Sequence, residues 1–390
     1  MTTTRLAALG HEEPPLLSLA QRLLSVAELG LPAMLLPGGE AFSFTMSGSK
    51  APSGSWTLER RGTSTRYAAI TALGVEFLPE DRQRAVLAGR SAQEFTGLLI
   101  ESLPAVTNLG DAALIAWAAA ETAHPKLSDA LERVEALDVE GRPQYTVEAA
   151  WVLSALAAAR GTVDVERRFS AARDRLLRAR IGDSPLFPHA TGPGLVPWYR
   201  SHVSCFADQT YPLQALARAH ASDDQGGDPE ALAASEACAA RICELQGDGG
   251  QWWWHYDART GGVVEGYPVY SVHQHAMAPT ALFDLTDAGG SDFGASIRKG
   301  LRWMTEVPEL AGHTERQEPL ILDELGATWR KVYRGDPKKA VRAARGLGTR
   351  LAPNLRLKSL DRVYRPLSVD RECRPYEFGW MLYAWQGGRI

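Results

Sequence analysis

The chain has 390 residues, of which 45% are hydrophobic and 23% charged, and its formal net charge is −4 at pH 7. This length is enough for one large domain or two ordinary ones with a full apolar core. The weakly acidic balance argues against a nucleic acid as partner. Four cysteines without a CxxC pair indicate a reduced, intracellular protein, which we expect to be cytoplasmic.

Residues 1–60 are expected to form a helix and an irregular segment that pack on the main domain. The first residues include acids and prolines, so the apolar core of a signal peptide is missing. The apolar stretch 16–36 is interrupted by Gln21, Arg22 and Glu28, which suits a packed helix better than a membrane span. The sequence is compatible with a protein that contacts a membrane surface without crossing the membrane.

Residues 61–390 are expected to form a single helical domain, because apolar residues recur there at helical spacing and alternating strand patterns are scarce. In several segments a polar residue stands seven positions before a small–large apolar pair. These polar residues are Thr65, Glu148, Asp208, Gln274 and Glu377. Such a repeat indicates an all-α fold, either a closed α/α toroid or an open α-solenoid. We favour the toroid, in which the polar residues surround one mouth.

The Pro/Gly-rich segment 186–205 precedes one of these helix starts. It carries His189, Trp198, Arg200 and His202. We interpret it as a loop folded over the mouth, since loops of this kind often carry binding residues. Trp198 is its candidate for substrate binding.

Asp208 lies in the sequence FADQT at the start of the following helix. A carboxyl group at an inner-helix start, desolvated by aromatic neighbours such as Tyr211, is suited to act as a general acid. The alternative is an ordinary helix cap ahead of Pro212. Gln209 and Tyr211 are the adjoining candidates for substrate binding.

The region 252–275 combines three consecutive tryptophans with the sequence His-Gln-His. Aromatic walls stabilise carbocations or stack on sugar rings. His273 and His275 are candidates to orient or reprotonate a catalytic acid, whereas a zinc site is not expected because a third ligand at suitable spacing is missing. The substrate-binding candidates here are Trp253, Trp254, Tyr267, Tyr270 and Gln274.

Near the C-terminus, Glu377 shares the offset of Asp208 and is the last catalytic candidate, with Tyr376 beside it as a substrate-binding candidate. Paired carboxyl groups across a cavity are what glycoside hydrolysis requires, although acids also favour the first turn of any helix. The basic segment 330–350 is either a solvated helix face or a contact for a diphosphate or a membrane surface. Nucleotide-binding and HExxH motifs are missing, and we expect neither a cofactor nor a metal.

Gln246, Gly250 and Trp252 match the Q-x3-G-x-W pattern of the QW repeat, and FADQT stands upstream at the place of the motif D-x-D-D-T. The chain thus resembles the squalene–hopene and class II terpene cyclases and related prenyltransferase-like α/α toroids. This resemblance implies that Asp208 protonates an alkene or epoxide. The chain departs from the motif at Phe206 and Gln209, where the family has aspartates.

Three functions follow from these patterns. The main expectation, which rests on the QW match, is a terpene-cyclase-like isomerase or lyase in which Asp208 starts the cyclisation or isomerisation of a prenyl substrate in a deep, aromatic-lined cavity. The alternative is a carbohydrate-active toroid enzyme, a hydrolase, lyase or epimerase, that uses Asp208, His273, His275 and Glu377 in an open polar cleft. The third is a toroid that binds a lipid or glycan without catalysis.

Overall fold

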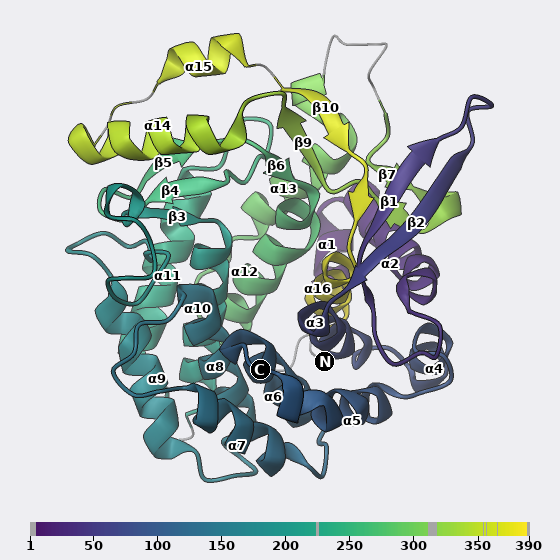
Figure 1. The fold of residues 1–390 in the computed structure, drawn as a ribbon, viewed down its shortest axis with the longest axis vertical. Helices are drawn as coiled ribbons and strands as arrows, with labels where there is room; N and C mark the ends of the chain where they lie inside the picture. Colours follow the sequence, from purple (N-terminus) through teal and green to yellow (C-terminus); the bar gives the residue numbers. More distant parts are fainter. Residues whose placement is uncertain are drawn as a thin grey trace.

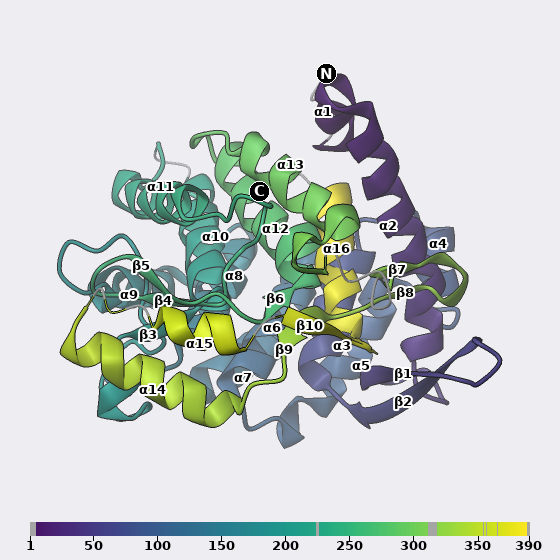
Figure 2. The same ribbon diagram turned by 90° about the horizontal axis from the view of Figure 1, so that it is seen from above.

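The computed structural model describes residues 5–223, 226–310, 318–353, 355, 357–364 and 366–387. Within these residues, six helices form an inner ring: α3 (Thr65–Val75), α6 (Leu109–Glu121), α8 (Thr146–Ala159), α10 (Ala207–Ala221), α12 (Ala278–Asp287) with the π-helical turn η3 (His273–Met277) ahead of it, and α16 (Pro375–Gln386). Each packs on the next, and α16 packs on both α12 and α3, so the ring is closed (Figures 1 and 2). The expected α/α toroid is confirmed, and the open solenoid is not formed.

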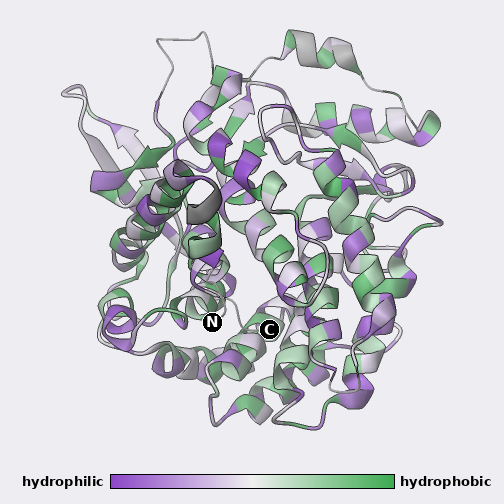
Figure 3. Ribbon diagram, turned by 180° about the vertical axis from the view of Figure 1, so that it is seen from behind, coloured by the Kyte–Doolittle hydropathy of each residue, from purple (hydrophilic) through white to green (hydrophobic). Residues whose placement is uncertain are grey.

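A second layer of helices surrounds the inner ring. These are α2 (Pro14–Met34), α5 (Ala92–Ser102), α7 (Leu127–Leu137), α9 (Glu166–Ala179), α11 (Pro229–Glu244) and α13 (Gly294–Glu306). The two layers differ in burial as their positions require: inner α8 buries 11 of its 14 residues, whereas outer α9 buries 4 of 14. Hydrophobic and hydrophilic residues accordingly mix along the outer helices (Figure 3). The further helices are α1 (Arg5–Glu12), α4 (Glu80–Val86), α14 (Lys338–Leu351) and α15 (Lys358–Val363).

Short antiparallel sheets lead into the inner helices. One sheet contains β1 (Ser43–Lys50), β2 (Trp56–Thr63) and β11 (Glu372–Cys373), and a second contains β3 (Val203–Cys205), β4 (His255–Asp257) and β5 (Gly262–Glu265). A third sheet contains β6 (Val269–Tyr270), β9 (Lys331–Arg334) and β10 (Pro366–Asp370). A fourth, two-stranded sheet pairs β7 (Ile321–Leu322) with β8 (Ala327–Thr328). Strands β2, β3, β6 and β11 stand directly before α3, α10, η3 and α16. The sheets therefore lie at the end of the ring where the inner helices begin, which we call the mouth.

The N-terminal residues pack on the toroid in two places. Helix α2 packs against α16 and α13, in the outer layer, and the β1–β2 hairpin joins β11 at the mouth. The expected boundary at residue 60 stays a prediction. Among the described residues, no helix combines the length and the apolar character that a bilayer crossing requires.

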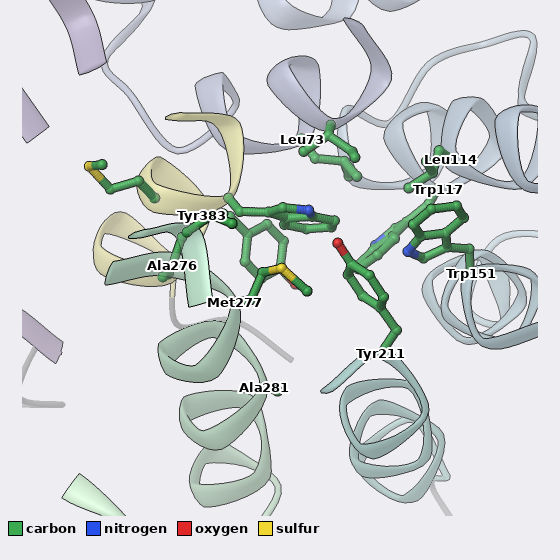
Figure 4. Packing of buried hydrophobic residues seen from close by; sticks show 14 of the residues in the cluster. Leu73, Leu114, Trp117, Trp151, Tyr211, Ala276, Met277, Ala281 and Tyr383 are labelled. Atoms are coloured by element: carbon green, nitrogen blue, oxygen red, sulfur yellow. The ribbon is translucent and has the colours of Figure 1, made fainter. Parts of the chain in front are cut away.

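Large aromatic side chains fill the axis of the toroid just below the mouth. Trp151, Tyr211 and Trp380 follow Glu148, Asp208 and Glu377 by three positions, which places them one helical turn deeper on the same face. The ring centroids of Trp151 and Tyr211 are 5.1 Å apart, and those of Tyr211 and Trp380 are 5.7 Å apart. Figure 4 shows Trp151 and Tyr211 meeting from separate helices. These three rings form the aromatic floor of the mouth.

Below the aromatic floor, a buried polar network closes the other end of the ring. Arg218 of α10 donates to the hydroxyl of Tyr383 at 2.6 Å and pairs with Glu121 of α6. Arg5 of α1 pairs with Asp284 of α12 at 2.6 Å. These layers fill the interior of the ring below the mouth.

We expect replacement of Trp380 by alanine to lower the free energy of unfolding by about 3–5 kcal/mol, the usual cost of removing a fully buried tryptophan. Its ring packs on Trp117, Tyr211 and Tyr383, and the cavity left behind cannot collapse against three rings. Chemical denaturation measures the change. The matched control is Trp198→Ala, because that side chain is 66% exposed and its loss should change stability by less than about 0.5 kcal/mol. Equal effects of the two substitutions would contradict the aromatic floor.

Candidate active site

One side chain from the second or third position of each inner helix lies at the mouth. These helix-start residues are Tyr67, Asp111, Glu148, Asp208, Gln274 and Glu377. Contacts join neighbouring starts around the ring: Asn108, the cap of α6, donates to Glu148 at 2.8 Å, and the ring of Tyr67 stacks on Tyr376 of α16 at 4.6 Å. The mouth is therefore a ring of polar and aromatic groups above the aromatic floor.

Asp208 is fully buried and pairs with His189, which sequence reasoning noted only as part of a loop. His189 Nδ1 lies 2.8 Å from Asp208 Oδ2, and the backbone N–H of Cys205 donates to the same oxygen at 2.6 Å. The Asp208 charge raises the pKa of His189. Asp208 Oδ1 has no hydrogen bond in the described part of the chain, although it is buried. Asp208 is not the residue that caps α10, since the N-cap position belongs to Phe206.

The loop that carries His189 is held between the starts of α8 and α10. Gln209 accepts from the Phe187 N–H at 2.8 Å and donates to the Phe187 carbonyl at 3.0 Å. On the other side, the Thr146 N–H donates to the His189 carbonyl at 3.0 Å. Gln209 was expected to bind substrate, a role that stays a prediction. Its observed contacts position the loop.

We expect Gln209→Leu to release this loop, because both Phe187 backbone groups would lose their partner while the side-chain volume is kept. Leaving buried polar groups unpaired costs about 1–3 kcal/mol. Hydrogen–deuterium exchange should become faster at residues 187–190, and His189 should lose its fixed position beside Asp208. Gln93→Leu is the control, since Gln93 donates to the carbonyls of Thr122 and Ala123, far from the loop that carries His189. Unchanged exchange at residues 187–190 in Gln209→Leu would show that the loop is held by other contacts.

Glu377 is a buried carboxyl group with an unusual charge state. Burial raises its pKa to about 8, although Arg330, Arg374 and Lys331 oppose the shift. Arg330 Nε lies 3.6 Å from Glu377 Oε1, and neither carboxyl oxygen forms a hydrogen bond within the described ranges. At neutral pH this group is mostly protonated, and it has its proton available for donation.

The wall beside Glu377 comes from α3 and the turn before α16. Arg374 donates to the Tyr67 hydroxyl at 3.0 Å and to Glu372 at 2.9 Å. The Arg330 guanidinium lies over the Tyr270 ring at 4.9 Å. Tyr67 was not among the expected site residues, and Arg330 was considered only as part of the basic segment 330–350, because packing between distant elements brings both to Glu377. Arg374 stands three positions before Glu377 and was considered as a residue that could bind an anion or pair with Glu377.

On the opposite side, a pocket of about 210 Å³ lies between the starts of α6 and α8; Asn108, Tyr145 and Glu148 are among its lining residues. Arg66 pairs with Asp111 at 2.7 Å at the neighbouring helix start. The Tyr145 ring lies 5.3 Å from that of His189, which connects this pocket to the Asp208–His189 pair.

The two expected histidines are buried and neutral. Burial lowers the pKa of His273 and of His275 to about 3. The His273 ring packs between Phe206 at 4.5 Å and Tyr270 at 5.0 Å, while both ring nitrogens of His275 are without a hydrogen bond in the described structure. Gln274 donates to the Tyr270 carbonyl at 3.2 Å. In the described residues, the histidine that pairs with Asp208 is His189 rather than His273 or His275.

The expected aromatic residues occupy different environments. Trp253 donates to the Leu245 carbonyl at 2.7 Å and packs edge-on against Tyr267. Trp254 stacks on His255 at 3.9 Å, and Trp198 is largely exposed in the loop before α10. Their part in substrate binding stays a prediction, as do the roles of Tyr211, Tyr270 and Tyr376.

The residues of the Q-x3-G-x-W pattern form a structural turn. Gln246 donates to the carbonyls of Gly250 and Ser296, each at 3.0 Å, which ties the end of α11 to α13. Gly250 has φ +91°, and a Cβ there would lie 2.1 Å from the Lys299 carbonyl oxygen, so only glycine fits. The Trp252 ring is buried against Phe206.

His189, Cys205 and Asp208 form a possible metal-binding group, since one ligand atom from each lies within 4.8 Å of the others. A nitrogen, a sulfur and a carboxylate oxygen suit zinc. Burial and the Asp208 charge raise the pKa of the Cys205 thiol well above its usual range, so metal binding would have to displace the thiol proton. The expectation that the chain binds no metal stays a prediction.

No family model and no curated protein matches the sequence. The fold is similar to an unsaturated glucuronyl hydrolase specific for heparin, at 14% identity and TM-score 0.55 over 95% of this chain and 96% of that one. It is also similar to a cellobiose 2-epimerase from Bacillus thermoamylovorans B4167, at 9% identity and TM-score 0.58 over 95% and 99%. A possible GH105 family member from Salmonella enterica subsp. enterica serovar Paratyphi A str. ATCC 9150 has 10% identity and TM-score 0.55 over 95% and 92%.

These comparisons contradict the expected resemblance to squalene–hopene and class II terpene cyclases. Two proteins that share the fold over nearly the whole chain are an unsaturated glucuronyl hydrolase and a cellobiose 2-epimerase. The QW match, the terpene-cyclase function and the prenyl substrate were therefore wrong expectations. The physical reason lies in Gln246 and Gln209, which hold a turn and a loop, and in an axis filled by aromatic rings where a deep chamber was expected.

Proposed function

We propose that this protein is a carbohydrate-active enzyme that hydrolyses a glycosidic bond by proton transfer at the mouth of the toroid. The observation that carries the proposal is the pair of carboxyl groups in opposite environments. Glu377 is buried with a pKa raised to about 8, whereas Asp208 is paired with a histidine whose pKa it raises. A protonated carboxyl group and a second carboxyl group that can accept a proton are the usual acid and base of glycoside hydrolysis.

In this reaction Glu377 is the acid. Its proton passes to the glycosidic oxygen as the bond to the anomeric carbon breaks, and the Glu377 carboxylate that forms is stabilised by Arg330, whose Nε lies 3.6 Å away. The Glu377 carboxylate appears only as the proton leaves. The positive charge of Arg330 therefore stabilises the transition state more than it stabilises the resting enzyme, and the barrier is lowered.

Asp208 is the base. Its free oxygen, Oδ1, is available to take a proton from the attacking water, while Oδ2 is held by His189 and the Cys205 N–H. His189 balances the Asp208 charge and fixes the direction of the carboxyl group. The water's oxygen joins the anomeric carbon, so the proton that Glu377 loses is matched by the one that Asp208 gains.

The aromatic surroundings suit a sugar. Tyr67 and Tyr376 stack on each other beside Glu377, and Tyr145 stands over His189 on the other side. Aromatic rings pack against the apolar faces of sugar rings, and the hydroxyl and arginine groups between them supply hydrogen bonds. The names of the toroid neighbours, a glucuronyl hydrolase and a cellobiose epimerase, support the same substrate class.

The test is to incubate the purified protein with a panel of neutral and acidic oligosaccharides and to follow the products by mass spectrometry. We expect two shorter saccharides whose masses sum to that of the substrate plus one water. An isomer of unchanged mass would indicate epimerisation, and an unsaturated fragment without added water would indicate a lyase. Either of these products, or an unchanged panel, would overturn hydrolysis.

A further inference from the structure

Helix α14 covers the mouth next to the loop before α10. It packs on β5 and on the 3-10 turn η2 (Trp198–Arg200), and Figure 1 shows it above β3, β4 and β5. One face of α14 points toward the toroid. This face carries Arg342, Arg345, Gly346 and Thr349, which are spaced as neighbours on one side of a helix.

Two residues of this face anchor α14. Arg345 Nε pairs with Glu265 Oε2 at 2.7 Å, and the Thr349 hydroxyl lies 2.9 Å from His202 Nε2. Gly346 lies against η2, since a Cβ there would be 3.3 Å from the Cβ of Arg200. These contacts fix how α14 sits on η2.

Arg342 differs from its anchored neighbours. Its guanidinium lies 3.9 Å over the Trp254 ring, which also stacks on His255 at 3.9 Å and lies 6.0 Å from the Tyr270 ring. Within the described residues the Arg342 side chain forms no hydrogen bond and no ion pair. Asp336 and Glu265 are the acids close enough to attract its charge, and Glu265 is already bound to Arg334 and Arg345.

Arg200 adds a second arginine of the same kind. The structure gives its side chain no hydrogen bond and no carboxylate partner in the part of the chain that it describes. Arg200 lies in η2, against Gly346 of α14, one helical turn from Arg342. Burial and the Arg200 charge both lower the pKa of Arg342, and the Arg200 charge also opposes protonation of His189 and His255. Half-buried cations that repel each other are stabilised when an anion binds between them.

We infer that Arg200 and Arg342 bind an oxyanion group, a carboxylate or a sulfate, of an acidic carbohydrate whose reacting bond lies at Asp208 and Glu377. Two guanidinium groups offer paired donors that match the planar carboxylate and the sulfate oxygens. The Trp254 ring already holds the Arg342 guanidinium by stacking, so less side-chain freedom is lost on binding. The inference rests on the proposed function, because the anion is taken to belong to the substrate.

The test is calorimetric titration of the intact protein with a heparin tetrasaccharide, its desulfated form and its carboxyl-reduced form. We expect Arg200→Gln and Arg342→Gln each to weaken binding of the tetrasaccharide by about 10- to 100-fold, the value of one charge-assisted hydrogen-bond pair. Arg342→Lys should recover part of this loss, because it restores the charge without the fork. Arg178→Gln on outer helix α9 is the control and should bind as the wild type does.

The derivatives identify the anion. If the desulfated form binds more weakly, the bound group is a sulfate. If the carboxyl-reduced form binds more weakly, the bound group is a carboxylate. Equal binding of all three forms, or unchanged binding by both glutamine variants, would overturn the inference. Hydrolysis of acidic oligosaccharides with unchanged kcat/KM in both variants would also overturn it while leaving the proposed function intact. Conversely, arginine-dependent binding without cleavage of any saccharide would reject the proposed function alone.

Discussion

Replacing Asp208 by asparagine is expected to lower kcat by a factor of about 10²–10⁴, the range for losing a positioned acid–base group. The amide keeps the shape of the side chain, and its oxygen can still accept from the Cys205 N–H. It cannot take a proton from water or balance the charge of His189. The pKa of His189, which the Asp208 charge raises, should fall in the variant, and NMR titration of the imidazole measures this.

Asp129→Asn is the matched control for this substitution, since Asp129 lies in the first turn of outer helix α7 and is exposed. Its activity should equal that of the wild type. If Asp208→Asn kept activity within about twofold with the same substrate, Asp208 would be a structural residue of the α10 start and the proposed mechanism would fail.

The second large effect is expected from Glu377→Gln, again a loss of about 10²–10⁴ in kcat, because the amide has no proton to donate. The pH dependence gives a sharper test. With the Glu377 pKa raised to about 8 by burial, the active protonated form is lost as pH rises through 8, and kcat/KM of the wild type should fall there. The residual activity of Glu377→Gln should lack this decline.

The pH dependence of folding stability should also reflect the protonation of Glu377. Between its ordinary pKa near 4.5 and the raised value near 8, the folded protein retains a proton that the unfolded chain releases. The contribution of Glu377 to stability is therefore full below about pH 4.5 and is lost as pH rises through 8. Thermal unfolding of Glu377→Gln should show less decline over this range, whereas Glu324→Gln, at an exposed position, should match the wild type. Identical pH profiles of both variants and the wild type would mean that Glu377 is ionised in the folded state.

The toroid could be predicted from the sequence because its signal is local and repeated. A polar residue followed by an apolar stripe marks Glu148, Asp208 and Glu377 as starts of equivalent helices. Since equivalent inner helices begin at the same end of a closed ring, their start residues share the mouth. The aromatic floor follows from the same spacing, as Trp151, Tyr211 and Trp380 stand three positions later.

The resemblance to terpene cyclases misled because the matched residues serve the fold. Gln246 and Gly250 make a tight turn between α11 and α13, which a ring of helical hairpins needs whatever its chemistry. Asp208 stands at an inner-helix start, a position that every inner helix of the ring has, so its place in the chain does not identify the reaction. The substrate is therefore not encoded by these positions, and Gln209, which replaces an acid of the motif, holds a loop.

The rest of the site depends on contacts that no local pattern reveals. His189 reaches Asp208 because Gln209 and Thr146 hold a loop of irregular structure. Arg330 reaches Glu377 from the residue ahead of β9, and the charge state of Glu377 results from burial among these elements. Sequence spacing marks candidate residues, whereas their pairing and protonation are set by tertiary packing.

The most direct test of the central claim is cleavage of an acidic oligosaccharide in water enriched in ¹⁸O by wild type, Asp208→Asn and Glu377→Gln. The account predicts that the wild type places one ¹⁸O atom at the new reducing end, and that both variants do so at least about 100-fold more slowly. Absence of ¹⁸O from the wild-type products, or equal rates in the three proteins, would contradict acid–base hydrolysis at this mouth.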